Sequence, residues 1–154
     1  MKLAFAGTPE IRATRDEVWR RVVDPRFVAA SAPGVESVEV LGENRFRMTL
    51  GFGIALLRFR FAMDVGFHDI VPRESARMEA RGAAPGTSVA MVSRIRLEEL
   101  APQRQRLHWS AETVVDGALA GVGARLVEGV ARKLTERFWE DFAKRVEEET
   151  SRSG

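Results

Sequence analysis

Few residues of this chain have the type and spacing that enzyme chemistry requires. Three residues come into question: His68, His108 and Asp64. They lie in segments where apolar and charged residues alternate, and each occupies the same alternate positions as the arginines. Because side chains alternate between the two faces of a strand, these groups are predicted to lie on a charged, solvated face. An acid–base catalyst must instead reach a substrate inside its site. The pattern therefore predicts no catalytic residue.

The composition of the chain argues against several further chemistries. The chain has 154 residues and no cysteine, so it has no disulfide framework, no thiolate metal site and no cysteine nucleophile. It contains no dinucleotide-binding, P-loop, serine-hydrolase or zinc-protease motif. The net charge is only +2, and the arginines are interleaved with glutamates instead of forming a basic run. We therefore expect no metal, no resident cofactor and no nucleic-acid partner.

Alternating apolar residues predict that most of the chain forms an antiparallel sheet. A first strand is expected over residues 1–13, and two short helices follow it, the first opened by a capping box over Thr14–Glu17. Six strands are expected between residues 35 and 115, joined by short turns. Gly51 and Gly53 predict a turn or a bulge. Because each strand has one apolar and one charged face, one side of the sheet is expected to be dry.

The last long segment, residues 116–149, is expected to form one helix that covers the dry face. Its apolar residues recur every four positions, whereas an α-helix has 3.6 residues per turn. Each repeat is therefore rotated by ~40° from the one before, so the apolar residues are predicted to form a stripe that winds obliquely around the helix. The stripe consists of Ala118, Val122, Leu126, Val130, Leu134, Phe138, Phe142 and Val146. Glycines in the first half of the helix favour close approach or empty space beneath it, and the bulky second half is expected to anchor it. We expect a single α+β domain over residues 1–149 and a disordered tail over 150–154.

The dry face of this sheet combines phenylalanines and methionines with small residues opposite them. Such a surface either interdigitates into a filled core or leaves an apolar pocket for a ligand, and a structure without a pocket of at least ~300 Å³ would favour the filled core of an interaction protein. The predicted ligand contacts are Phe46, Met48, Leu57, Phe59, Phe61, Met63, Met78, Met91, Ser93, Ile95, Trp109, Thr113, Gly121, Val122, Leu126 and Val130.

The order of elements, together with three short stretches, resembles a known superfamily. These are Glu17-Val-Trp19 through Asp24-Pro25, then Ala32-Pro-Gly34-Val35, then Asp116-Gly117 with Gly121, Gly123, Leu126 through Arg132, Phe138 and Phe142. The chain resembles the helix-grip, START-like (SRPBCC) lipid-binding domains, which include the birch-pollen allergen and polyketide cyclases. Within that superfamily it is similar to the family of the carbon monoxide dehydrogenase protein CoxG.

The resemblance implies a fold and a role. The implied fold is a curved, seven-stranded antiparallel sheet with two short helices after the first strand and a long C-terminal helix over its concave face. The implied role is an apolar ligand carrier associated with aerobic CO dehydrogenase or related molybdenum hydroxylases. Members of the family are implicated in membrane attachment of that enzyme and in quinone handling. The expected ligand is accordingly a hydrophobe such as a quinone or a fatty acid.

Three functions stay open at this stage. The first is a non-catalytic carrier of a lipid-like or quinone-like molecule, located in the cytoplasm with peripheral contact at the inner face of the membrane. The second is an enzyme of the polyketide cyclase or dehydratase type, for which only Ser93 and Thr113 are polar residues on the dry face. The third is an interaction protein with a filled core. A molybdenum hydroxylase complex is the expected protein partner of the carrier.

Overall fold

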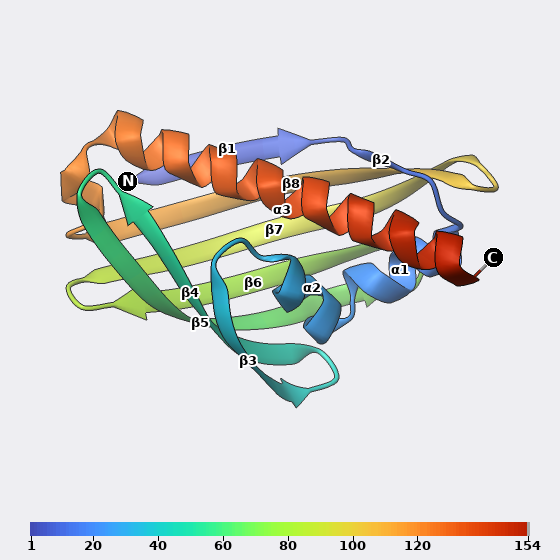
Figure 1. Ribbon diagram of the computed structural model, residues 1–154, viewed down its shortest axis with the longest axis horizontal. Helices are drawn as coiled ribbons and strands as arrows, with labels where there is room; N and C mark the ends of the chain where they lie inside the picture. Colours follow the sequence, from blue (N-terminus) through green and yellow to red (C-terminus); the bar gives the residue numbers. More distant parts are fainter. Residues whose placement is uncertain (154) are drawn as a thin grey trace.

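A computed structural model describes residues 1–153 as one antiparallel sheet with helices on one of its faces (Figure 1). The long helix α3 lies across that face, and the two short helices contact it. The elements are β1 (Lys2–Gly7), β2 (Glu10–Ile11), α1 (Arg15–Val22), α2 (Pro25–Ser31), β3 (Val35–Gly42), β4 (Arg45–Ile54), β5 (Leu57–Val71), β6 (Ser75–Ala84), β7 (Thr87–Ala101), β8 (Arg104–Gly117), the 3-10 turn η1 (Ala120–Val122) and α3 (Ala124–Ser153).

The sheet follows the antiparallel order β1-β8-β7-β6-β5-β4-β3, and the short β2 also pairs with β8. This α+β helix-grip architecture confirms the expected fold class. The expected first strand over residues 1–13 is divided in two around Thr8-Pro9, because proline cannot donate a hydrogen bond to the ladder. The capping box at the start of α1 is confirmed, since Thr14 Oγ1 accepts from the Glu17 amide at 3.2 Å and Glu17 accepts from the Thr14 amide.

The predicted boundaries of the long helix were wrong at both ends. Strand β8 continues to Gly117, whose φ of +91° and close approach to the Gly86 carbonyl leave no room for a Cβ atom. The helix begins only after Gly123, whose φ is +127°. It then continues to Ser153, so residues 150–153 are helical where a disordered tail was expected. Gly154, the last residue of that expected tail, lies outside the described residues.

The hairpin between β4 and β5 is longer than predicted. Gly51 and Gly53 do not form a turn or bulge but pair in register with β5. A Cβ atom at Gly51 would lie 2.7 Å from Glu36 Oε1, the end of a flexible side chain that can move aside, and the Gly51 amide donates to the Gly34 carbonyl at 2.9 Å. The turn occurs instead at Ala55-Leu56, where Ala55 has a φ of 54°.

The second half of α3 anchors the short helices to the sheet. Phe142 is completely buried and meets Phe27 of α2 edge to face, with ring centroids 5.4 Å apart. Arg145 strengthens the same contact between α2 and α3, because its Nη1 donates to the Phe27 carbonyl at 3.0 Å and to Ser31 Oγ at 2.7 Å. This half of the helix therefore matches the bulky anchor expected from the sequence.

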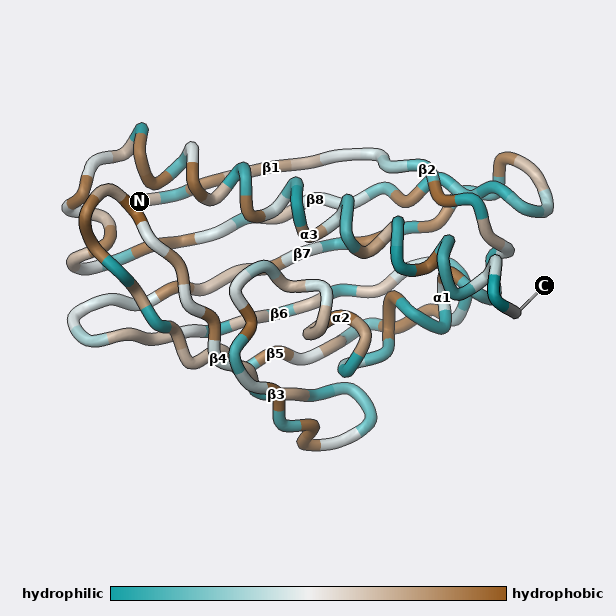
Figure 2. Tube along the Cα trace, viewed as in Figure 1, coloured by the Kyte–Doolittle hydropathy of each residue, from teal (hydrophilic) through white to brown (hydrophobic). Residues whose placement is uncertain are grey.

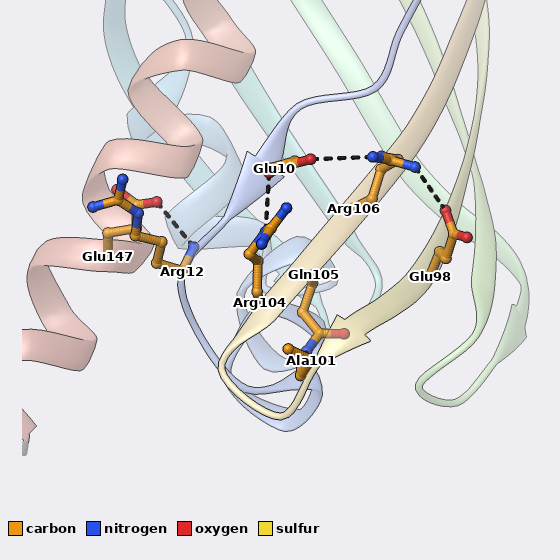
Figure 3. A network of polar contacts seen from close by, with 8 residues as sticks. All are labelled: Glu10, Arg12, Glu98, Ala101, Arg104, Gln105, Arg106 and Glu147. Atoms are coloured by element: carbon orange, nitrogen blue, oxygen red, sulfur yellow. Dashed lines mark hydrogen bonds and ion pairs between the residues drawn. The ribbon is translucent and has the colours of Figure 1, made fainter.

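The outer face of the sheet carries ion pairs, and a backbone hydrogen bond beside them reaches the helix (Figure 3). Glu10 of β2 accepts from Arg104 and Arg106 of β8, both at 3.1 Å. The Arg12 amide, just after β2, donates to Glu147 of α3 at 2.9 Å. Hydrogen bonds from Arg104 and then Arg106 hold the pKa of Glu10 below its ordinary value of 4.5.

Replacing Glu10 by glutamine is expected to change stability in a pH-dependent way. Because its pKa is lowered in the folded protein, the Glu10 carboxylate stabilises the fold above the unfolded-state pKa, and this contribution is lost as the pH falls through the folded-state value. E10Q should therefore be less stable than the wild type at pH 7, and the difference should vanish in acid. Urea unfolding at several pH values measures it, with exposed Glu43→Gln as control. A constant offset at all pH values would contradict the assignment.

Candidate functional site

A cavity of about 240 Å³ lies between α3 and the inner face of the sheet. Its walls come from strands β4 to β8, from α3 and from the end of α2, and nearly all of them are apolar. The volume is below ~300 Å³, so by the criterion of size alone the interaction protein is favoured over a carrier. The space that is present fits a small apolar group or one end of a longer molecule. The structure places nine of the predicted contact residues in its lining, namely Phe46, Met48, Phe61, Met63, Met78, Met91, Ser93, Thr113 and Val130.

Two predicted contacts on β5 lie outside the lining although they have the correct strand parity. Leu57 is next to the turn of the β4–β5 hairpin and is half exposed. Phe59 stacks on Phe52 at a centroid distance of 5.8 Å, and it is Phe52 that lines the cavity. Alternation along a strand assigns a face of the sheet, but it does not say how far the covering helix extends along that face.

Ile95 and Trp109 also lie outside the lining, toward the other end of the cavity. Trp109 stacks on Trp139 of α3 with centroids 5.7 Å apart, and the two rings fill the space between helix and sheet there. Ile95 borders a separate void of about 10 Å³ beside Phe142. The inner face therefore has a filled half under the anchor of α3 and a hollow half under its first turns.

The helix residues show the largest difference from prediction. Gly121 and Val122 precede α3, and Leu126 is 51% exposed on its flank. The glycines do not create the cavity, since Gly121, Gly123 and Gly129 are exposed and a Cβ atom at each would meet nothing. The helix residues that line the cavity and that the prediction left out are Val127, Ala131, Leu134, Thr135, Phe138 and Trp139.

The cavity opens on one side of α3. On the flank facing β4 and the α2–β3 connection, its lining residues Pro33, Leu50, Phe52 and Val130 are only partly buried. On the other flank, buried residues such as Leu3 close the space against β1. A ligand would therefore enter between the first half of α3 and the β4–β5 hairpin.

The polar residues in the described lining are three hydroxyl residues, two on the sheet and one on the helix. Thr135 Oγ1 donates to the Ala131 carbonyl at 2.7 Å and is thereby satisfied. Ser93 is 3% exposed, and neither its hydroxyl nor that of Thr113 hydrogen-bonds to any other group in residues 1–153. Thr113 is only partly buried, so both hydroxyls lie on the cavity surface with their hydrogen-bonding capacity unused by the protein.

The ionisable groups considered for catalysis lie on the opposite face of the sheet, as predicted. His68 approaches Glu79 at 3.5 Å, and His108 contacts Glu98 at 2.9 Å. The hydrogen bond from His108, with a smaller contribution from Arg106, lowers the pKa of Glu98. Acid–base groups on that face cannot reach a molecule in the cavity.

Within residues 1–153, no group of three or more histidine, cysteine, aspartate or glutamate residues is arranged to hold a metal ion. No helix in the same part of the chain is both long enough and apolar enough to cross a membrane.

A long helix held against an antiparallel sheet, with an apolar cavity between them, defines a START-like helix-grip domain. Solved structures agree with this class. A conserved protein from Geobacillus kaustophilus is 26% identical, with 94% of this chain and 95% of that chain covered and a TM-score of 0.84. The Zhui aromatase/cyclase from Streptomyces sp. R1128 is 19% identical, with 99% and 95% covered and a TM-score of 0.67. A START superfamily protein from Mycobacterium smegmatis is 14% identical, with 96% and 99% covered and a TM-score of 0.72.

The family itself is shown by a sequence model. The model for CoxG, a subunit of carbon monoxide dehydrogenase, matches residues 7–147. The chain therefore belongs to the CoxG family, as its resemblance indicated. No curated protein matches it.

Proposed function

We propose that this protein is a non-catalytic carrier of a lipid-like or quinone-like molecule, accessory to molybdenum hydroxylases of the CO dehydrogenase type. The observation that carries the proposal is the apolar cavity beneath α3, whose lining contains the hydroxyls of the buried Ser93 and the partly buried Thr113, neither of them hydrogen-bonded within residues 1–153. Membership of the CoxG family supports the accessory role. The apolar lining supports a hydrophobic ligand, because burial of apolar ligand surface is the main favourable contribution available there.

The size and opening of the cavity suggest how such a ligand is held. At about 240 Å³, the cavity accommodates a quinone ring or part of an acyl chain, but not a long isoprenoid tail in addition. The remainder of a long ligand would leave between α3 and β4, over the partly buried Leu50 and Phe52. The head of the ligand then lies inside and its tail lies in the opening.

The two hydroxyls favour a ligand with an accepting oxygen at its buried end. Ser93 on β7 and Thr113 on β8 lie on adjacent strands, and Ser93 pairs with Ala111, two residues before Thr113. Each hydroxyl can donate one hydrogen bond and accept others. A quinone carbonyl or a carboxyl group would satisfy one or both of them, which distinguishes these ligands from a plain hydrocarbon.

Direct binding tests this function. We expect native mass spectrometry of gently extracted protein to detect a hydrophobic ligand, and short-chain quinones to quench the fluorescence of Trp139, which lines the cavity. W19F keeps both tryptophans near the cavity and removes the third, partly buried one on α1 as background. Protein that repeatedly contains no hydrophobe, and that binds neither quinones nor fatty acids, would contradict the proposal.

Replacing Ser93 by alanine is expected to weaken quinone binding about three- to tenfold, the equivalent of one hydrogen bond of ~0.5–1.5 kcal/mol. Binding of an alkane of similar size should not change, because it makes no hydrogen bond. Fluorescence titration of both ligands measures the difference, and Ser110→Ala on the exposed face of β8 is the matched control. Equal effects of S93A on quinone and alkane would show that the hydroxyl does not contact the ligand.

A further inference from the structure

An open groove of about 720 Å³ lies on the outer face of the sheet, opposite the cavity. Strands β6, β7 and β8 run side by side beneath it (Figure 1). Hydrophilic residues alternate with hydrophobic ones along β7 and β8, as Figure 2 shows, so their hydrophilic side chains share this outer face. The described lining includes three arginines and three hydroxyl residues among small ones. The groove is therefore basic and rich in hydrogen-bond donors, unlike the apolar cavity.

Strand pairing brings the arginines of this groove together. Arg77 of β6 lies directly opposite Arg94 of β7. Arg96, two residues further along β7, lies opposite His108 of β8. Directly opposite residues on one face of an antiparallel pair have Cβ atoms about 4.5–5.5 Å apart, and like charges placed there destabilise the sheet. An anion bound between the guanidinium groups would offset this repulsion.

Carboxylates neutralise one of the three arginines but not the other two. The partly buried Arg77 donates to Asp69 at 2.9 Å and also to Glu79. Arg94 and Arg96 are exposed, and neither forms an ion pair or a side-chain hydrogen bond within residues 1–153. Their two guanidinium groups therefore keep both their charge and their donors for a ligand.

A β-bulge in β5 places Asp69 against Arg77. The register of β5 on β6 shifts between His68 and Val71, and Asp69 within this bulge has a φ of 50°. Positive φ is uncommon for residues other than glycine, and bulges often re-aim a side chain beside a functional site. Here the Asp69 carboxylate holds the Arg77 guanidinium at the groove. A guanidinium held in this way loses less rotamer freedom when a ligand binds.

We propose that this groove binds the phosphate group of a small, water-soluble phosphate monoester. Such a group carries about −1.5 to −2 charges at pH 7, which matches the two unpaired guanidinium groups of Arg94 and Arg96. Arginine binds phosphate oxygens through two parallel hydrogen bonds. The hydroxyls of Ser75, opposite Arg96, and Ser110, opposite Arg94, have no partner within residues 1–153 and can donate to the same group. A carboxylate, with one charge and two oxygens, would use fewer of these donors.

The size and composition of the groove favour a small molecule over a protein partner. Its volume lies within the ~300–1,000 Å³ of small-molecule sites. Its exposed residues are arginines, hydroxyl residues and small residues, whereas the centre of a protein interface is usually apolar and aromatic. Because the groove and the cavity lie on opposite faces of the sheet, the inference does not depend on the carrier function.

Calorimetric titration with phenyl phosphate tests the proposal, with benzoate and phenol as comparison ligands. We expect phenyl phosphate to bind, and benzoate and phenol to bind at least about tenfold more weakly. The double variant R94Q/R96Q should lose at least about tenfold in affinity for phenyl phosphate, because it removes the two unpaired charges. Arg81→Gln is the matched control, since Arg81 is exposed on the same face of β6 but lies outside the groove. Equal affinities of R94Q/R96Q and R81Q would overturn the proposal.

Loss of binding by the double variant must not result from loss of folding. R94Q/R96Q should unfold at no lower urea concentration than R81Q, because replacing Arg94 removes its repulsion from Arg77.

Nuclear magnetic resonance of the unaltered protein locates the ligand without any variant. Phenyl phosphate should shift the backbone amide resonances of residues 94–96 and 108–110 more than those of α3, which covers the cavity. Shifts confined to α3 would overturn the proposal. Binding only to a glutamate-rich peptide, or only to vesicles of phosphatidic acid, would assign the groove to another kind of partner and would likewise overturn it.

Discussion

Replacing Phe142 by alanine is expected to lower the free energy of unfolding by about 3–5 kcal/mol. Phe142 is 0% exposed and packs edge to face on Phe27, with further ring contacts to Phe138 and Trp139. Removal of its ring leaves a cavity where α2, α3 and the sheet meet. These rings hold one another in place from three sides, so the site is poorly able to collapse around the void.

Urea unfolding measures this loss, and Leu126→Ala is its control. Leu126 is on the same helix but half exposed, so its truncation should cost well under 1 kcal/mol. Because the Phe27–Phe142 contact ties α2 to the end of α3, F142A should also increase hydrogen exchange in both helices. A loss below about 1 kcal/mol for F142A would show that the anchor lies elsewhere.

The different effects expected for Phe142 and Leu126 reflect different packing at the two ends of α3. Toward its C-terminal end the helix contacts both short helices and fills the space above the sheet with aromatic rings. Toward its N-terminal end it contributes only aliphatic side chains such as Val127 and Val130 above the cavity. The aromatic anchor and the aliphatic wall of the cavity thus lie toward opposite ends of one helix. Phe138 and Trp139 belong to both, because they line the cavity and contact Phe142.

The sequence predicted the sheet correctly because its signal is simple. Alternation with a period of two assigned Phe46, Met48, Phe61 and Met63 to the inner face, and all four line the cavity. Alternation does not show how far along its strand a residue lies from the cavity. Phe59 has the same parity but lies past the cavity, and only the three-dimensional position of α3 shows this.

The helix was harder to place because two periods compete in its sequence. The four-residue step selected Val122 and Leu126, but an α-helix has 3.6 residues per turn, and Leu126 turns out toward solvent. Val130, Leu134 and Phe138 belong to the four-residue step and line the cavity, whereas Val127 and Ala131, which also line it, fit only the helical spacing. That spacing was present in the sequence, whereas the start of the helix depended on Gly117 and Gly123, whose positive φ angles end the strand and precede the helix.

Replacing Ala80 by phenylalanine is expected to abolish ligand binding while the protein stays folded. Ala80 is buried on β6 and lines the cavity, with Val65 and Met91 as its cross-strand neighbours. A benzyl side chain would project into the empty space, and the cost of overpacking should stay near the lower end of the usual ~1–3 kcal/mol. The ring would occupy the volume that a ligand head needs.

The expected loss in affinity follows from the area that the ligand can no longer bury. Displacing about 100 Å² of apolar ligand surface at ~25 cal/mol/Å² costs about 2.5 kcal/mol, on the order of 100-fold in Kd. Quinone titration and urea unfolding of the same protein measure binding and stability, with Ala90→Phe on the exposed face of β7 as the matched control. If A80F were folded and bound quinone as tightly as A90F does, the ligand would have to lie outside the cavity.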